Sequence, residues 1–223
     1  MSILTAKNVE YTYRTRYQTV HALQGVSCEF ELGQAYAIVG RSGSGKTTLL
    51  SLLAGLDLPD TGEIAFEGEK TSQMNRDLYR REKVSVVYQA FHLFPLLTAL
   101  ENVMYPMELS GTKPKEAKKR AKALLRQVGL PESVDKQYPK MMSGGEQQRV
   151  AIARALASSA KVLLADEPTG NLDSENSQNI IDILLRLAHE EGRCVILITH
   201  DNEIAGQADH ILRLKDGAVV GAA

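Results

Sequence analysis

One short stretch, Gly40 to Thr48, constrains the fold of this chain more than any other feature of its sequence. It reads Gly-Arg-Ser-Gly-Ser-Gly-Lys-Thr-Thr, follows the apolar run 35–39 and precedes the helix-like run 49–54. A strand, a glycine-rich turn and a helix in that order, with the pattern Gly-x-x-x-x-Gly-Lys-Thr, form a P-loop. Such a turn points several backbone N–H groups inward, beside the positive end of the helix dipole. The stretch therefore predicts a cradle for the phosphates of a nucleotide.

The P-loop positions have separate chemical roles. Gly40, Gly43 and Gly45 let the main chain approach a phosphate because no Cβ stands in the way. Lys46 is expected to act on the β- and γ-phosphates as a mobile cation, and the Thr47 hydroxyl to ligate Mg²⁺. The alternative, a glycine-rich turn that only closes a βα unit, is disfavoured by the full match. The other loop residues expected to bind the nucleotide are Arg41, Ser42, Ser44 and Thr48.

Length and composition narrow the classes of protein. A chain of 223 residues suits one large α/β domain or a domain with an inserted lobe. Lys and Arg number 26 against 27 Asp and Glu, so the charge balance gives no sign of a nucleic-acid partner. Cys28 and Cys194 lie in apolar, strand-like runs and suggest reduced thiols in a cytosolic compartment. No apolar run approaches the roughly 18 residues of a membrane span, so the chain is not expected to cross a membrane by itself.

Polar side chains close three further apolar strands, which are predicted at 84–88, 161–165 and 194–199. Ligands bind at the carboxyl ends of strands in α/β sheets. Gln89 could thus reach Mg²⁺ or an attacking water, and Asp166 could hold Mg²⁺. Glu167 is placed to orient or deprotonate a water, and His200 could bond to a γ-phosphate. On position alone, an ordinary polar strand end fits Gln89 equally well, and a lone histidine there is more often structural.

The opening segment predicts antiparallel β-structure. Residues 3–13 read as a strand, a polar turn covers 14–19 and a second β-like run covers 26–32. Tyr13, at the end of the first strand, could stack its ring on an adenine base. An aromatic residue packed on the strand surface is the alternative, and Tyr11 is a rival for the stacking role.

From Leu100 to about Ala157 the pattern is helical, which predicts an inserted helical lobe. Within it, Ser143 and Glu146 have the spacing of a capping box, in which side chains satisfy the free N–H groups of a helix start. Gly144 and Gly145 follow the serine and leave an open helix N-terminus able to accept a phosphate. The same turn can therefore serve as a cap and as an anion site.

Together these motifs resemble those of the ATP-binding subunits of ABC transporters, over essentially the whole chain. Gly40 to Thr47 resembles the Walker A motif, and Val162 to Asp166 the Walker B strand, followed by the catalytic base at Glu167. Ser143-Gly144-Gly145 resembles the signature, here with Met142 for the usual leucine and Glu146 for the usual glutamine. The resemblance further matches Gln89 to the Q-loop, Asn171-Leu172-Asp173 to the D-loop, His200 to the switch histidine, and Tyr13, rather than Tyr11, to the adenine-stacking aromatic.

The resemblance implies an α/β fold in a single domain, 1–223. Its P-loop NTPase core, with a mostly parallel sheet and an N-terminal antiparallel β subdomain, is expected at 1–89 and 161–223. The inserted helical subdomain that carries the signature is expected at 90–160.

The resemblance also implies a mechanism. Two chains arranged head to tail would pair each P-loop with the partner's signature, Ser143, Gly144 and Gly145, and enclose two ATP with Mg²⁺. Asp173 of the D-loop is also expected to bind the nucleotide. Hydrolysis would drive a separate integral membrane permease, with the chain held peripherally at the cytoplasmic face of the membrane. Residues 143–149 and 168–173 look like the branch that serves lipoprotein release, macrolide and antimicrobial-peptide export, and cell division. Export or extraction of a peptide, drug or lipoprotein is the expectation; signalling without transport, as in cell division, is the alternative.

Two other classes of P-loop protein fit less well. A DNA-repair or chromosome-structure ATPase would need long coiled-coil or zinc insertions, which this chain lacks. A P-loop kinase gives no reason for Ser143-Gly144-Gly145 or for His200.

Overall fold

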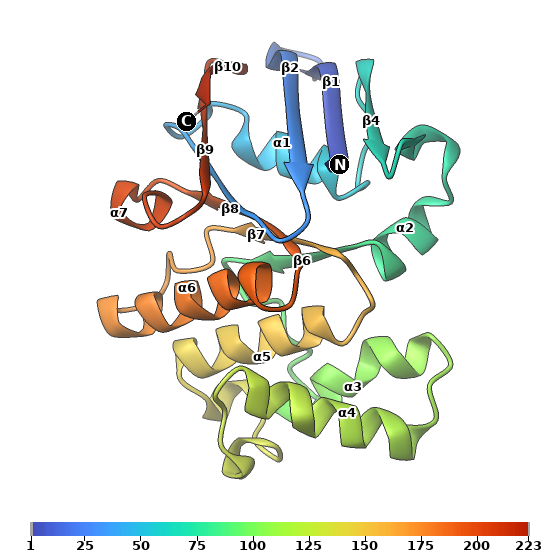
Figure 1. Ribbon diagram of the computed structural model, residues 1–223, viewed down its shortest axis with the longest axis vertical. Helices are drawn as coiled ribbons and strands as arrows, with labels where there is room; N and C mark the ends of the chain where they lie inside the picture. Colours follow the sequence, from blue (N-terminus) through green and yellow to red (C-terminus); the bar gives the residue numbers. More distant parts are fainter. Residues whose placement is uncertain (1, 223) are drawn as a thin grey trace.

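The computed structural model describes residues 2–222, which form two β-sheets and the helices that pack on them (Figure 1). The larger sheet has six strands in the order β10-β9-β3-β8-β7-β6, and the smaller has four in the order β2-β1-β4-β5. Within the larger sheet, β3 and its neighbours β8, β7, β6 and β9 run parallel, and only β10 is antiparallel. The mostly parallel core predicted from the sequence is confirmed.

The register of the larger sheet brings four strand ends to one edge. Tyr88 pairs with Asp166, Asp166 with Ile198, and Val39 with Thr199. The residues that follow these strands therefore lie next to one another. The strands are β3 (Ala35–Val39), β6 (Val84–Tyr88), β7 (Val162–Asp166), β8 (Cys194–Thr199), β9 (His210–Lys215) and β10 (Ala218–Ala222).

The smaller sheet is antiparallel throughout, as predicted. Its second strand begins earlier than expected, because Thr19 already pairs with Arg14 of the first strand. The side chains of residues 19–21 are exposed, so the apolar alternation that marks a half-buried strand is missing there. The strands are β1 (Ser2–Arg14), β2 (Thr19–Glu31), β4 (Thr61–Phe66) and β5 (Glu69–Lys70).

Helices cover both faces of the larger sheet, and the predicted helical lobe is confirmed as α3 (Ala99–Leu109), α4 (Pro114–Gln127) and α5 (Gly144–Leu156). The remaining helices are α1 (Lys46–Leu53), α2 (Arg76–Glu82), α6 (Ser174–His189) and α7 (Asn202–Ala205). Short 3-10 turns lie at Thr71–Gln73, Glu132–Val134 and Pro139–Met141. Among residues 2–222, none of the helices has both the length and the apolar character needed to cross a membrane.

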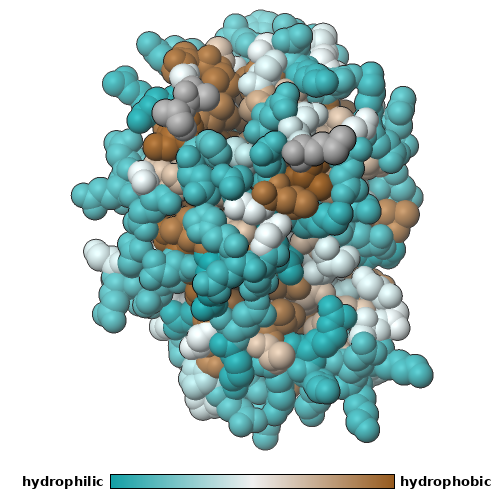
Figure 2. Space-filling model, in the orientation of Figure 1, coloured by the Kyte–Doolittle hydropathy of each residue, from teal (hydrophilic) through white to brown (hydrophobic). Residues whose placement is uncertain are grey.

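The apolar side chains gather in two clusters, one on each face of the larger sheet. On one face, Leu163 of β7 belongs to the same cluster as Leu184 of α6 and Val150 of α5. On the other, Leu164 of β7 shares a cluster with Leu50 of α1. The molecular face in Figure 2 is mostly hydrophilic, with hydrophobic residues in separate patches. Because Val150 and Leu163 belong to one cluster, the helical lobe and one face of the larger sheet share a core. The boundaries expected at 89/90 and 160/161 stay a prediction.

Candidate functional site

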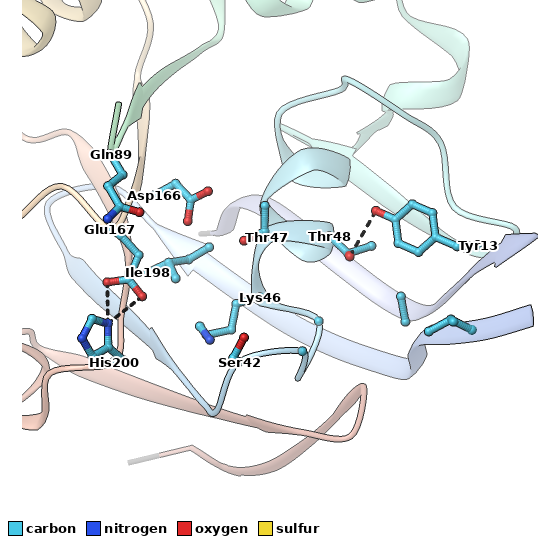
Figure 3. A pocket seen from close by; sticks show the side chains of 14 residues that line it. Tyr13, Ser42, Lys46, Thr47, Thr48, Gln89, Asp166, Glu167, Ile198 and His200 are labelled. Carbon is cyan, nitrogen blue, oxygen red and sulfur yellow. Dashed lines mark hydrogen bonds and ion pairs between the residues drawn. The ribbon is translucent and has the colours of Figure 1, made fainter. Parts of the chain in front are cut away.

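A cavity of about 670 Å³ opens at the edge where the parallel strands end (Figure 3). Its volume is within the usual range for a small-molecule site. The structure brings many of the predicted residues together here: Tyr13, Ser42, Gly43, Gly45, Lys46, Thr47, Thr48, Gln89, Asp166, Glu167 and His200. The wall also includes Val20, Ala22 and Ile198, which no sequence pattern identifies, because an apolar residue in a strand carries no mark of a neighbouring ligand.

The P-loop is pressed closely against the strands around it. Gly45 has a φ of 100°, and a Cβ there would lie 2.4 Å from the carbonyl oxygen of Ala22 in β2. A Cβ on Gly40 would lie 2.3 Å from the carbonyl oxygen of Leu214 in β9. Both contacts are too short for any side chain. These two glycines are therefore required by backbone packing, in addition to the approach of a phosphate.

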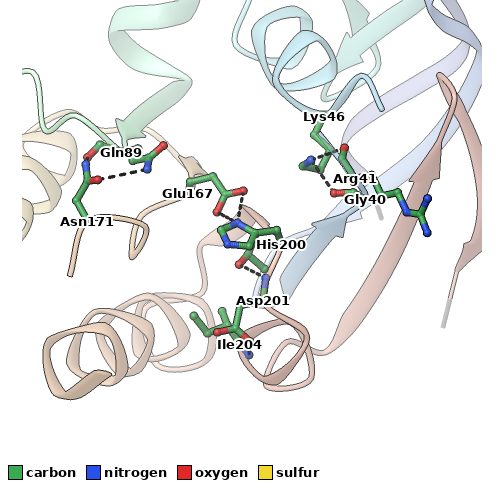
Figure 4. Close-up of polar contacts among 10 residues, drawn as sticks. Gly40, Arg41, Lys46, Gln89, Glu167, Asn171, His200, Asp201 and Ile204 are labelled. Carbon is green, nitrogen blue, oxygen red and sulfur yellow. Dashed lines mark hydrogen bonds and ion pairs between the residues drawn. The ribbon is translucent and has the colours of Figure 1, made fainter. Parts of the chain in front are cut away.

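The start of α1 has the properties of an anion site. Its N-cap is Gly45, and no side chain caps the free N–H groups of the first turn. Lys46 is buried, and its Nζ donates hydrogen bonds to the carbonyl oxygens of Gly40 at 2.8 Å and Arg41 at 3.1 Å (Figure 4). Both of these hydrogen-bond partners are neutral, and a buried ammonium is stabilised by a closely paired anion. A phosphate group in the cavity would supply it.

Two neighbouring carboxyl groups face the P-loop across the cavity (Figure 3). Burial and the adjacent Glu167 raise the pKa of Asp166, while Lys46 acts in the opposite direction. Glu167 has a φ of 46°, and its carboxylate accepts from Nδ1 of His200 at 3.0 and 2.9 Å. The imidazole thus fixes the carboxylate in place at the strand edge.

The oxygen donors of the cavity suit Mg²⁺, which prefers carboxylates, hydroxyls and water. The Thr47 hydroxyl, the Asp166 carboxylate and the Gln89 side chain all line it. Within residues 2–222 there is no cluster of three or more His, Cys, Asp or Glu side chains that could hold a metal alone. A magnesium ion would therefore take further ligands from phosphate and water, as it commonly does in phosphoryl-transfer sites.

Gln89 is held by Asn171, the first residue of the string that resembles the D-loop. The Asn171 Nδ2 donates to the Gln89 carbonyl oxygen at 3.0 Å, and the Gln89 Nε2 donates to the Asn171 Oδ1 at 3.5 Å (Figure 4). A Cβ on Gly170 would lie 2.6 Å from the Gln89 Nε2. The glutamine side chain therefore rests against the segment that follows Glu167.

The structure separates the two tyrosines that compete for the stacking role. Tyr13 is half-exposed and lines the cavity, with its hydroxyl 3.3 Å from that of Thr48. The Tyr11 hydroxyl donates to Asp57, and this hydrogen bond raises the pKa of Tyr11 to about 12. Tyr11 packs edge-on against Tyr13 at a centroid distance of 5.0 Å. Tyr13 is the one that a base could reach, and adenine stacking stays a prediction.

Other predicted residues lie outside this cavity. Gly40, Arg41 and Ser44 line a neighbouring cavity of about 750 Å³, which also includes His200 and Arg213. The residues Ser143, Gly144, Gly145 and Asp173 line neither cavity.

The predicted capping box at the start of α5 is confirmed. The Ser143 N–H donates to the Glu146 carboxylate at 2.8 Å, and the Glu146 N–H donates to the Ser143 Oγ at 3.3 Å.

A Cβ on Gly145 would lie 2.4 Å from Oδ1 of Asn176, and Asp173 caps α6 by accepting from the Asn176 N–H at 2.8 Å. Close packing against the start of α6 is thus a sufficient structural reason for Gly145.

Comparisons with known proteins show the family of this chain. Residues 23–170 match the family model described as ABC transporter. The lipoprotein-releasing system ATP-binding protein LolD of Aquifex aeolicus is 44% identical, over 98% of this chain and 96% of its own length. The macrolide export ATP-binding/permease protein MacB of Syntrophobacter fumaroxidans is 41% identical over 98% of this chain, which covers 31% of that longer protein.

Solved structures show the same fold. The ATP-binding cassette MJ0796, a dimer in a post-hydrolysis state bound to ADP and Pi, has a TM-score of 0.91 at 39% identity, over 99% of this chain and 97% of that one. The protein cbiO1 of Clostridium perfringens, part of the transporter complex cbiONQ, has a TM-score of 0.88 at 29% identity, over 100% of this chain and 88% of its own. The chain belongs to the ABC transporter family, as one of its ATP-binding ATPase cassettes.

Proposed function

We propose that this chain hydrolyses ATP as a head-to-tail pair and thereby drives a separate integral membrane permease. The observation that carries the proposal is the separation of the two anion-binding helix starts. The cavity beside Lys46 is lined by the P-loop and by the candidate metal ligands, whereas Ser143 and Gly144 lie outside it in the same chain. A second copy, turned by a two-fold axis, would bring its Ser143 turn to this cavity. The dimeric state of the similar cassette MJ0796 supports this arrangement.

Within each site, we assign a separate role to each of these residues. The P-loop N–H groups and Lys46 would bind the phosphates, while Thr47, Asp166 and Gln89 would hold Mg²⁺, which neutralises charge on the phosphates. Glu167 would orient the attacking water and accept its proton. His200, already hydrogen-bonded to Glu167, would keep this carboxylate in position and contact the γ-phosphate.

A mixing experiment tests whether the site is shared between chains. Ser143→Glu places a negative charge where a phosphate should bind and is compatible with a helix start; Glu167→Gln removes the base. Each variant alone should be nearly inactive. If Ser143 acts on the partner's nucleotide, each site combines Glu167 of one chain with Ser143 of the other. In a mixed dimer, one site then carries both changes and the other carries neither. Mixing equal amounts before ATP is added should therefore restore up to about a quarter of wild-type activity, if chains pair at random in a two-fold dimer.

The matched control is a mixture of Glu167→Gln with Lys46→Ala. Both changes affect the P-loop side of a site, so each site of that mixed dimer carries one defect and no activity should return. If the Ser143→Glu mixture also stays inactive although mixed dimers form, the signature turn does not act on the partner's nucleotide.

The permease contact is proposed at a groove of about 630 Å³ beside the segment that follows Gln89. Its walls include the part-exposed apolar residues Phe94, Tyr105 and Leu109. Apolar side chains rimmed by charged ones are typical of a protein contact. An ATPase joined to a permease is named in the relative MacB, and a multi-protein transporter in the neighbour cbiO1. We place the chain at the cytoplasmic face of the membrane, held there only through the permease.

The relatives also guide the proposed direction and cargo. LolD and MacB are named for lipoprotein release and macrolide export. Export or extraction of a lipoprotein, drug or peptide is accordingly the transport activity that we propose for the complex.

Tyr13→Ala should weaken ATP binding about tenfold, since the loss of one base-stacking ring typically costs 1 to 3 kcal/mol. Tyr11→Phe should leave affinity nearly unchanged, because it removes only the hydroxyl that contacts Asp57. Equilibrium binding of ATP to the two variants measures both effects. A larger loss for Tyr11→Phe than for Tyr13→Ala would contradict the stacking assignment.

A further inference from the structure

Arg154, in the last turn of α5, holds the segment that follows Gln89. Its guanidinium donates to the His92 carbonyl oxygen at 2.6 Å and to the Phe91 carbonyl oxygen at 3.1 Å. It also lies over the ring of Phe94, with 5.7 Å from Cζ to the ring centroid. One side chain therefore binds three residues of one short segment.

The backbone that Arg154 holds is strained. Phe91 has a φ of 57° and His92 a φ of 47°, so two successive residues with side chains adopt the left-handed conformation. Each such residue typically costs 1 to 3 kcal/mol and persists only when its surroundings enforce it. Charge-assisted hydrogen bonds to both carbonyl groups offset this cost. Arg154 therefore stabilises a turn that these residues would not adopt alone.

The strained turn contacts both halves of the proposed ATP site. On one side, the His92 ring packs edge-on against Tyr88, the residue before Gln89, at a centroid distance of 5.0 Å. On the other, a Cβ on Gly144 would lie 3.7 Å from Cζ of Phe91, so the Phe91 ring reaches the start of α5. The turn therefore lies between the strand end that carries Gln89 and the start of the signature helix.

We infer that Arg154 is a positioning residue for ATP hydrolysis: by holding the turn at Phe91 and His92 it sets the place of Gln89 at the metal and of α5 at the partner's nucleotide. The inference rests on the function proposed above. Arg154 touches neither nucleotide nor metal site, since it does not line the cavity. It acts through Gln89 and through the helix on which it stands.

The same guanidinium also lines the groove proposed for the permease, together with Phe94 and Tyr105. A partner segment seated there would press on Phe94 and Arg154 at once. Arg154 therefore connects this groove to the segment after Gln89, so that binding of a permease segment in the groove would affect the position of Gln89.

Substitutions of Arg154 test the inference in the intact chain. Arg154→Met keeps much of the side-chain volume and removes the donors; Arg154→Lys keeps the charge but replaces the planar fork with a single ammonium. Arg149→Met is the matched control, because Arg149 is on the same helix and no hydrogen bond joins it to segment 89–94 among the described residues. Three quantities are measured: ATP affinity in EDTA, kcat at saturating ATP, and the Mg²⁺ concentration that gives half-maximal activity.

We expect Arg154→Met to keep ATP affinity in EDTA within about twofold, since the P-loop contacts are separate from the turn. Its kcat should fall by about ten- to a hundredfold, as for misplaced catalytic groups. Its half-saturating Mg²⁺ concentration should rise about tenfold, the scale seen when a partner of a metal ligand is removed. The kcat and the half-saturating Mg²⁺ concentration of Arg154→Lys should lie between those of Arg154→Met and of the wild type. Both quantities should be unchanged in Arg149→Met.

A lower melting temperature with unchanged kcat and unchanged Mg²⁺ dependence would reduce Arg154 to a structural residue and overturn the inference. An equal rise of the half-saturating Mg²⁺ concentration in Arg149→Met would also overturn the inference. If Arg154→Met does not fold, wild-type Mg²⁺ dependence in Arg154→Lys would also overturn it. Failure of the wild-type chain to bind ATP would instead contradict the proposed function itself, so the two failures are distinguishable.

Discussion

Replacing Glu167 with Gln is expected to slow ATP turnover by about two to four decades, the scale of a removed general base. The amide has nearly the same shape but cannot take a proton from the attacking water. Its oxygen can still accept from Nδ1 of His200, so the arrangement at the strand edge should be kept. ATP binding should persist, because the P-loop and Lys46 are untouched. Steady-state phosphate release and equilibrium ATP binding measure the two effects separately.

The same variant should form a stable dimer when ATP is present, because the enclosed nucleotide is not consumed. Gel filtration with and without ATP gives the result directly. Glu69→Gln, an exposed glutamate in β5, is the matched control and should behave as wild type. A Glu167→Gln chain that stays monomeric at saturating ATP would count against the head-to-tail pair, and one that retains full turnover would remove Glu167 from the role of base.

The second large effect is expected for Lys46→Ala, which should lower ATP affinity by about ten- to a hundredfold through the loss of a charge-assisted contact. The fold should remain, since the groups that Lys46 contacts are the carbonyl oxygens of Gly40 and Arg41 at an open cavity that water can reach. Equilibrium titration with ATP measures the loss, and thermal melting verifies the fold.

Lys7→Ala, at an exposed position of β1, is the control for general effects of charge and should bind ATP as wild type does. Unchanged affinity in a folded Lys46→Ala chain would mean that the buried ammonium has no phosphate partner. That result would contradict the proposed ATP site itself. Loss of dimerisation alone would not contradict that site.

Much of the site was predictable because its parts are local patterns. The P-loop occupies consecutive positions, and Gln89, Asp166 and His200 each follow an apolar run. Parallel strands in one sheet bring such ends to one edge, which the pairing of Tyr88 with Asp166 and of Val39 with Thr199 confirms. The capping box at Ser143 was equally local, since its two partners are three residues apart.

The sequence by itself determined the phosphate cradle, the polar strand ends and the α/β alternation, because each depends on residues close together in the chain. Only the tertiary structure showed that Tyr13 lines the cavity, whereas the Tyr11 hydroxyl donates to Asp57, which is distant in sequence. It also showed that Gly145 packs against the side chain of Asn176, and that Arg154 holds a turn some sixty residues earlier in the chain. These facts depend on which segments, distant in the sequence, come into contact when the chain folds. No local pattern in the chain encodes such long-range contacts.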